Sequence, residues 1–148
     1  CQTAYGVAGD TFTLGDAQLK LLWPTEGFDA SDPNEISLVH QVTYGEYSFL
    51  LTGDAGKDDE EGFLSQVQPV TVLKAGHHGS DTSSTEAFLQ KAQPEYVVIS
   101  VGAGNSYGHP SPAMLERLDE NCQVLRTDEK GSIVFTVKEG ELHVSTAR

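Results

Sequence analysis

The sequence predicts one α/β domain, and two observations lead to that prediction. The first third is rich in short hydrophobic runs separated by turns, whereas the middle alternates hydrophobic runs with helical patterns. A chain of 148 residues can bury a core, and 38% hydrophobic with 21% charged residues is typical of a globular domain. We therefore expect a single folded domain, without internal repeats.

The first third predicts strands and one acidic loop. Residues 10–23 read as two strands around a Gly-Asp turn, and Pro24 ends the second. The acidic run at 26–35 has the composition of a surface loop. Residues 36–43 resume as a strand in which His40 alternates with its neighbours, so we expect His40 to be a packed or cross-strand residue rather than a ligand.

A second hairpin and a charged helix follow. The turn at 44–46 leads into a strand at 47–51, which stops just before Asp54. The charged run at 56–62 should begin a helix that reaches about Gln66. We expect its four acids to form a solvated face: Asp58, Asp59, Glu60 and Glu61.

The rest of the chain alternates helix and strand. The pattern TEAFLQKA at 85–92 predicts a helix that buries Phe88, Leu89 and Ala92 before Pro94 ends it. After a strand that begins at Glu95, a Pro-opened helix is predicted at 111–122. Three strands separated by glycine-containing turns then complete the chain, and the last carries His143, which we expect to be structural.

Three predicted strands deliver metal-binding side chains just past their ends. The buried run at 70–73 reaches Gly76 and then His77 and His78, which cannot point the same way if the strand continues. Asp54 follows the preceding strand, and His109 lies in the glycine-rich loop after the next one. Asp and His at several strand ends are typical of metal sites, so this edge is the candidate site.

Charge and composition exclude some classes of protein. Nine basic against 22 acidic residues give a net charge of −13, which argues against a module that coats nucleic acid. An anionic substrate remains compatible if bound cations supply the positive charge. No hydrophobic run approaches the roughly twenty residues that span a bilayer, so we expect a soluble chain. Cys1 and Cys122 are too few for a disulfide framework, and residues 1–9 read as a linker.

Four ordered blocks carry a resemblance to a known family: LLTGDAG, LKAGHHGSDTSS, SVGAGNSYGHPSPAMLERL and RTDEKGSIVFTV. In order and spacing they resemble the metallo-β-lactamase-like domain at the C-terminus of ComEC-type DNA-uptake channel proteins of competent bacteria. The resemblance covers roughly residues 23–137. It implies an αββα sandwich that holds two divalent metals, zinc or manganese, between its sheets.

The resemblance also implies roles for single residues. Asp54 matches the aspartate that bridges the two metals, and His77 is the preferred histidine ligand, with His78 as the second choice or as a catalytic residue. His109 would hold or protonate the scissile phosphate, or act as a ligand. Two further residues are expected to contact substrate: Ser80 and Asn105.

One departure from the family pattern limits what this chain is expected to do. The motif HxHxDH is absent, although in the family it precedes the strand that ends in Thr-Gly-Asp. We therefore expect the C-terminal half of the sandwich, with an exposed sheet face that favours self-association. The expected partners are the N-terminal half of the domain, a transmembrane channel domain and, for the parent protein, DNA. The expected location is the extracytoplasmic side of a bacterial inner membrane.

Two functions stay open from the sequence. The parent protein is a metal-dependent hydrolase of phosphodiester bonds, with this chain inactive alone and a weak metal binder, or the domain is a non-catalytic interaction or structural module. The retained Asp54, His77 and His109 favour the first reading, and the acidic balance of the isolated chain favours the second. Lactam or thioester hydrolysis shares the scaffold but has no support in the HHGS and GHPSP blocks.

Overall fold

The computed structural model describes residues 5–29 and 32–147 and has the predicted α/β class. The strands are β1 (Thr11–Leu14), β2 (Ala17–Trp23), β3 (Val39–Tyr44), β4 (Tyr47–Leu51), β5 (Val72–Lys74), β6 (Tyr96–Ile99), β7 (Gln123–Arg126), β8 (Ser132–Lys138) and β9 (Glu141–Ala147). The helices are α1 (Lys57–Phe63), α2 (Glu86–Ala92), α3 (Pro112–Leu115) and α4 (Thr127–Lys130), and the 3-10 turns are η1 (Pro33–Ile36), η2 (Leu64–Gln66) and η3 (Gly76–Gly79).

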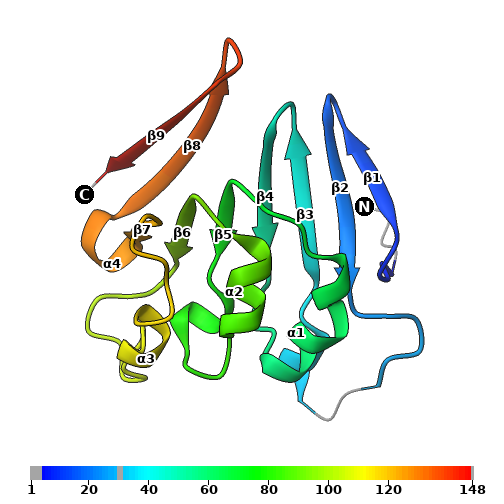
Figure 1. The fold of residues 1–148 in the computed structure, drawn as a ribbon, viewed down its shortest axis with the longest axis horizontal. Coiled ribbons are helices and arrows are strands. Elements are labelled where there is room, and N and C mark those ends of the chain that lie inside the picture. The colour runs from blue at the N-terminus through cyan, green and yellow to red at the C-terminus, as the bar shows by residue number, and fades with distance from the viewer. Residues whose placement is uncertain (1–4, 30–31, 148) are drawn as a thin grey trace.

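A seven-stranded sheet runs from β1 to β7 in the order of the chain. β1 to β4 pair antiparallel through the two predicted hairpins, whereas β4 to β7 pair parallel. Figure 1 shows the chain crossing the sheet from β1 on the right to β7 on the left. Because parallel strands share one direction, the carboxyl ends of β4 to β7 lie at the same edge of the sheet.

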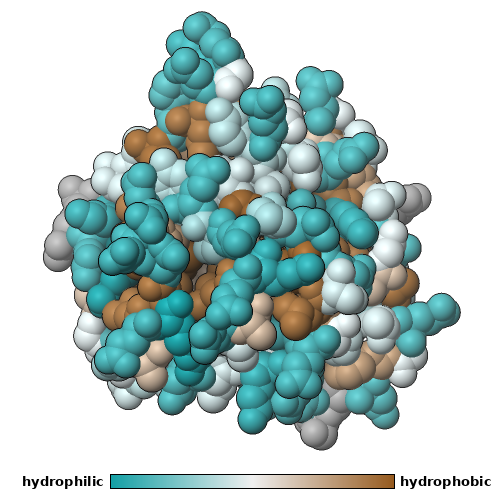
Figure 2. Space-filling view, viewed as in Figure 1, coloured by the Kyte–Doolittle hydropathy of each residue, from teal (hydrophilic) through white to brown (hydrophobic). Residues whose placement is uncertain are grey.

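The helices α1, α2 and α3 cover one face of the sheet (Figure 1). Each belongs to a crossover between neighbouring parallel strands, and crossovers of one hand that step in one direction place their helices on the same side. Under them Leu50, Leu73 and Val97 lie in register across the sheet. They share a fully buried cluster with Phe63 and Phe88, whose rings meet edge to face at 5.8 Å. Figure 2 shows the outside of this layer, where hydrophilic side chains surround hydrophobic patches.

The opposite face of the sheet is only half buried. The separate β8–β9 hairpin packs against part of it, with the Phe135 ring 6.0 Å from the ring of Phe49 and 5.5 Å from that of Tyr96. The Tyr47 hydroxyl donates to the carbonyl of Gly140 at 3.0 Å and so fixes the hairpin turn. On this face Val72 is buried at 5% exposure, whereas Leu19, Val42, Phe49 and Tyr96 keep part of their surface in contact with water.

The prediction of a solvated acidic face on α1 was wrong for two of its four residues. Asp58 and Glu61 are exposed, but Asp59 and Glu60 are only 4% and 1% exposed. Asp59 accepts a hydrogen bond from the backbone N–H of Gly56 at 2.8 Å and caps the helix. Glu60 points into the fold, where backbone donors of a loop satisfy it. A run of charges does not show which acids will find buried donors.

Two predicted helices, α2 and α3, can be compared with the structure. α2 buries the predicted Phe88, Leu89 and Ala92. α3 is shorter than the predicted 111–122: after Leu115 the backbone continues in tighter turns, in which the N–H of Arg117 donates to the carbonyl of Met114 and that of Leu118 to the carbonyl of Leu115, both at 3.2 Å.

The remaining His and Cys residues lie away from the candidate site or outside the described ranges. His40 is half-buried in β3 and His143 is exposed on β9. Cys122 is a free, half-buried thiol whose pKa is raised by burial. Cys1 lies outside the described residues. Within the described ranges, no helix combines the length and hydrophobicity needed to cross a bilayer.

Candidate functional site

The predicted site residues gather where β4, β5 and β6 end. Asp54 follows β4, His77 and His78 follow β5, and His109 lies in the segment after β6. We call residues 75–85 the His77 loop and residues 100–109 the His109 loop. Since the three strands are parallel, all four side chains come from the same edge of the sheet, as the sequence predicted.

Asp54 is held in place from two sides. Its backbone N–H donates to the Ser37 hydroxyl at 3.0 Å. The half-buried Lys74 ammonium donates to the carbonyls of Gly53 at 2.9 Å and Ala75 at 3.0 Å, and so joins the ends of β4 and β5. Burial lowers the pKa of Lys74, while the nearby Asp54 carboxylate opposes that shift. A positive charge therefore lies behind the turn that presents Asp54.

His77 and His78 both adopt the left-handed backbone conformation, with φ of 46° and 55°. This conformation is strained for side chains other than Gly, Asn and Asp, and it points two successive side chains at the rim of the sheet. The backbone N–H of His77 donates to the carbonyl of Gly53 at 3.1 Å, so the turn is tied to the end of β4. The sequence predicted that His77 and His78 cannot point the same way if the strand continues; β5 ends at Lys74, and a left-handed turn carries both histidines.

The His78 ring has a defined tautomer. Its Nδ1 lies 2.7 Å from the carbonyl oxygen of Ser100, which can only accept, so Nδ1 carries the proton. In neutral imidazole the Nε2 atom then holds a lone pair, and it lies 3.6 Å from Oδ1 of Asp54. Two acceptors facing each other are stabilised by a proton or a metal cation between them. A backbone carbonyl on the second ring nitrogen is also the usual support of a metal-binding histidine.

The His109 ring lies close to that of His77. Their ring centroids are 5.9 Å apart, and the centroids of His77 and His78 are 6.5 Å apart. The Tyr107 ring stacks on His109 with 6.0 Å between centroids and 18° between planes. The rim thus holds an Asp54–His78 pair beside a His77–His109 pair.

The described residues bring possible metal donors together in pairs and form no complete metal centre. Across 5–29 and 32–147, no three or more His, Cys, Asp or Glu side chains are arranged to hold a metal ion. The donor types suit zinc or manganese, but the geometry brings them together in pairs. A further ligand is therefore needed for a closed coordination shell.

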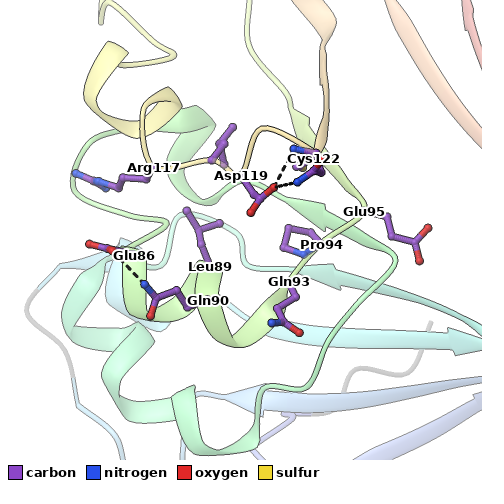
Figure 3. Close-up of a pocket in the computed structure, with 11 residues that line it drawn as sticks. Glu86, Leu89, Gln90, Gln93, Pro94, Glu95, Arg117, Asp119 and Cys122 are labelled. Atoms are coloured by element: carbon purple, nitrogen blue, oxygen red, sulfur yellow. Dashed lines mark hydrogen bonds between the residues drawn. The ribbon is translucent and has the colours of Figure 1, made fainter.

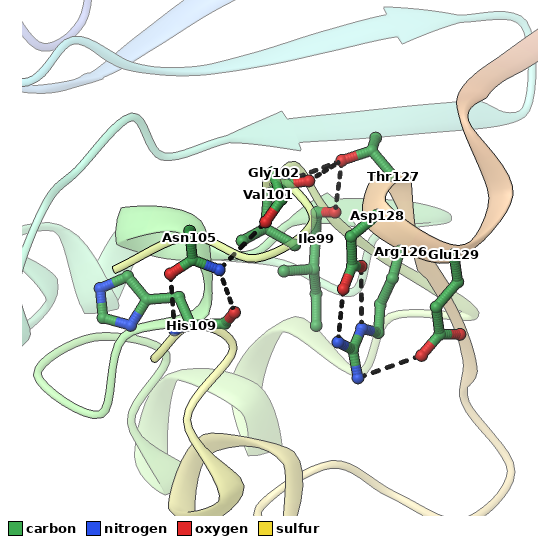
Figure 4. A network of polar contacts seen from close by, with 9 residues as sticks. All are labelled: Ile99, Val101, Gly102, Asn105, His109, Arg126, Thr127, Asp128 and Glu129. Carbon is green, nitrogen blue, oxygen red and sulfur yellow. Dashed lines mark hydrogen bonds and ion pairs between the residues drawn. The ribbon is translucent and has the colours of Figure 1, made fainter. Parts of the chain in front are cut away.

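Ser80 and Asn105, the two residues predicted to contact substrate, form hydrogen bonds within the protein. Ser80 is 4% exposed, and its hydroxyl lies 3.0 Å from that of Thr82. The Asn105 amide donates to the carbonyl of His109 at 2.7 Å and accepts from its backbone N–H at 3.1 Å, so it braces the His109 loop (Figure 4). These positions favour supporting roles over direct contact with substrate.

Two charged side chains whose contacts the sequence did not reveal support the His77 loop: Glu60, which is buried, and Arg117, which is half-buried. The Glu60 carboxylate accepts from the backbone N–H groups of Ser84 at 2.6 Å and Thr85 at 2.9 Å, and from the Thr85 hydroxyl at 2.7 Å. The Arg117 guanidinium donates to the carbonyls of Asp81 and Ser83, both at 3.0 Å. No local pattern predicts such long-range bonds. The sequence does show a basic residue, Lys74, two positions before Gly76, but it does not show which carbonyls Lys74 contacts.

A third support comes from the end of β7. The Thr127 hydroxyl donates to the carbonyl of Val101 and accepts from its backbone N–H, both at 2.8 Å. Arg126 forms a double hydrogen bond with Asp128 in the same network (Figure 4). The start of the His109 loop is therefore fixed to the neighbouring strand.

A hollow of about 410 Å³ lies beside the histidines. His78, His109, Asn105, Tyr107 and Thr127 line it together with the backbone at 100–102, and no carboxylate does. A larger hollow of about 560 Å³ lies between α2 and the segment after α3, and Glu86, Glu95 and Asp119 lie along it (Figure 3). That larger hollow contains none of the predicted site residues.

Comparisons with known proteins point to one family. The model of the metallo-beta-lactamase superfamily matches residues 26–103. The chain is 38% identical over 133 residues to ComE operon protein 3 of Bacillus subtilis, covering 88% of this chain and 17% of that protein. It is 36% identical over 121 residues to competence protein ComA of Neisseria gonorrhoeae, covering 79% and 18%. It is 34% identical over 116 residues to recombination protein 2 of Haemophilus influenzae, covering 78% and 15%. The chain spans less than a fifth of the length of each of these relatives.

Proposed function

Because the chain belongs to the metallo-beta-lactamase superfamily and matches ComEC-type competence proteins over most of its length, we propose that it is part of a metal-dependent hydrolase domain. The proposed reaction is cleavage of phosphodiester bonds of DNA during uptake. The chain would work within a longer inner-membrane protein, on the extracytoplasmic side. Its partners there would be the other half of the domain and a transmembrane channel domain.

The observation that supports this proposal best is the pairing of Asp54 with His78. The Ser100 carbonyl fixes the proton on Nδ1 of His78, which leaves Nε2 facing Oδ1 of Asp54 at 3.6 Å. This arrangement favours His78, the second choice from the sequence, over His77 as the ligand beside Asp54. Zinc or manganese bound there would supply positive charge next to a scissile phosphate and lower the pKa of water.

The other residues of the rim have roles that need no metal. Lys74 keeps the ends of β4 and β5 together and so sets where Asp54 points. In this proposal His109 would hold a phosphate oxygen or give it a proton. The remaining metal ligands would come from residues outside the described ranges 5–29 and 32–147.

A non-catalytic role is the second candidate. The incomplete ligand set in the described ranges and the net charge of −13 both favour an interaction or structural module. The two candidate functions predict different results when Asp54 or His78 is replaced: DNA cleavage falls only if the domain is a hydrolase.

The test uses the longer protein that contains this chain, with manganese and linear DNA. Asp54→Ala and His78→Ala should each reduce the cleavage rate by about 100-fold or more, since each removes a ligand. His143→Ala is the matched control, because it removes an exposed histidine on β9. Unchanged cleavage in both site variants would leave the non-catalytic role.

The isolated chain gives a second test. We expect calorimetry to show weak zinc or manganese binding and expect no DNA cleavage, because the ligand set within the described residues is incomplete. Two tight sites on the isolated chain would contradict this expectation.

A further inference from the structure

We propose that Tyr107 and the hollow beside it bind a nucleobase of an unpaired DNA strand. This inference rests on the proposed function and adds to it a contact for the base next to the scissile phosphate. It assigns a role to a residue that neither the metal site nor the fold requires.

Tyr107 is available to a ligand. Its side chain is 81% exposed, although it stacks on His109 with 18° between the two ring planes. Contact with His109 supports one face of the ring, and so much exposed surface leaves the other face free. A flat aromatic ring in this position suits stacking on a base, which every nucleotide offers.

The hollow has the size and charge that a nucleotide needs. Its volume of about 410 Å³ lies within the range of small-ligand sites. None of its lining residues is acidic, although the chain has 22 acidic residues against nine basic ones. Two histidines and the Thr127 hydroxyl line it instead. An anionic ligand therefore meets no carboxylate in the lining itself, and the nearest one described, Asp54, lies 3.6 Å from the ring of His78.

The loop that carries Tyr107 is already shaped. The Asn105 side chain accepts from the backbone N–H of Tyr107 at 3.2 Å and bonds the backbone of His109 in both directions. An aromatic side chain on a braced loop loses little freedom when a base stacks on it. The base would lie on Tyr107, and its phosphate would lie toward His109 and His78.

Unpaired DNA fits this geometry better than a duplex. A base inside a duplex already stacks on its neighbours and offers no free face, whereas an unpaired base can turn onto the tyrosine. A protein segment that packs on Tyr107 is the competing explanation, and it predicts an effect on folding rather than on DNA binding.

The test measures binding of the full 148-residue chain to a fluorescent oligothymidine by anisotropy, in chelator and at low salt. Tyr107→Ala should weaken binding about tenfold, whereas Tyr107→Phe should bind like wild type because the ring remains. Tyr5→Ala is the matched control, since Tyr5 is a fully exposed tyrosine outside the site. An abasic oligonucleotide should show no difference between wild type and Tyr107→Ala.

Three results would overturn the inference. These are equal affinity of wild type and Tyr107→Ala, an equal loss with the abasic strand, or a fall in thermal stability of Tyr107→Ala that explains the loss. Because the assay contains chelator and no reaction, its outcome is independent of the cleavage test. Loss of binding without any effect of Asp54→Ala on cleavage would reject the hydrolase and retain the base contact.

Discussion

The His77 loop and the His109 loop lie at the same edge of the sheet, but they are held in different ways. Charged side chains from distant elements fix the His77 loop, with Glu60 and Arg117 bonded to its backbone. The His109 loop is braced mainly by its own Asn105 and by Thr127 at its start, and most of its tip is exposed. The first loop is thus built like a core, and the second like a binding loop.

The largest expected effect is at the contact between the loops. Gly79 has a φ of +85°, and a Cβ there would lie 2.8 Å from Cβ of Pro110. Gly79→Ala should lower the free energy of unfolding by about 3 kcal/mol, because it adds both strain and a clash. Urea denaturation measures this. Gly104→Ala, with a φ of +69° and nothing within 4 Å, is the control and should lose about 1 kcal/mol. Equal losses would show that the loops do not differ in packing.

The second-largest expected effect is that of Glu60→Gln. The amide replaces one acceptor of three hydrogen bonds by a donor, so we expect a loss of about 2 kcal/mol in the free energy of unfolding. Burial raises the pKa of Glu60, against the effects of Thr85, Ser84 and Arg117. A carboxyl with a raised pKa stabilises the fold below its unfolded pKa, and this contribution is lost as pH rises through the folded pKa.

The pH dependence of this difference can be measured directly. Between about pH 4 and about pH 7, the gap in unfolding free energy between wild type and Glu60→Gln should become smaller as pH rises. Urea denaturation at several pH values checks this. A gap that grows with pH would mean that the hydrogen bonds outweigh burial.

Asn105→Ala should act locally. It removes the brace of the His109 loop but no buried core contact, so the unfolding free energy should change by less than about 1 kcal/mol. Hydrogen exchange of the Tyr107 and His109 amides should become clearly faster, while amides in the His77 loop stay protected. Faster exchange in both loops would show that they are one cooperative unit.

The smallest effect concerns association rather than stability. The sequence predicts that the half-buried sheet face promotes self-association, and light scattering over a concentration series tests this prediction. We expect the mean mass to rise with concentration. A monomer at all concentrations would show that the β8–β9 hairpin covers that face sufficiently.

The sequence predicted more of the fold than of the site. Alternating hydrophobic runs and turn residues predicted β1 to β9, α1 and α2, because those signals are local. The burial of Glu60 could not be predicted, since its donors at Ser84 and Thr85 are more than 20 positions away. The motif brought Asp54, His77, His78 and His109 to one rim, but the pairing of Asp54 with His78 depends on a left-handed turn and on the Ser100 carbonyl. Only coordinates reveal such a pairing.

The β8–β9 hairpin has a consequence for any further layer of this molecule. Phe135 packs on the sheet face over β4 and β6, where its ring contacts those of Phe49 and Tyr96. The side chains of Leu19 and Val42 lie in the same row as Phe49 but toward β1. A second sheet would therefore have to approach from the β1 side, and it would meet the open edge of the sheet before it reached the hairpin.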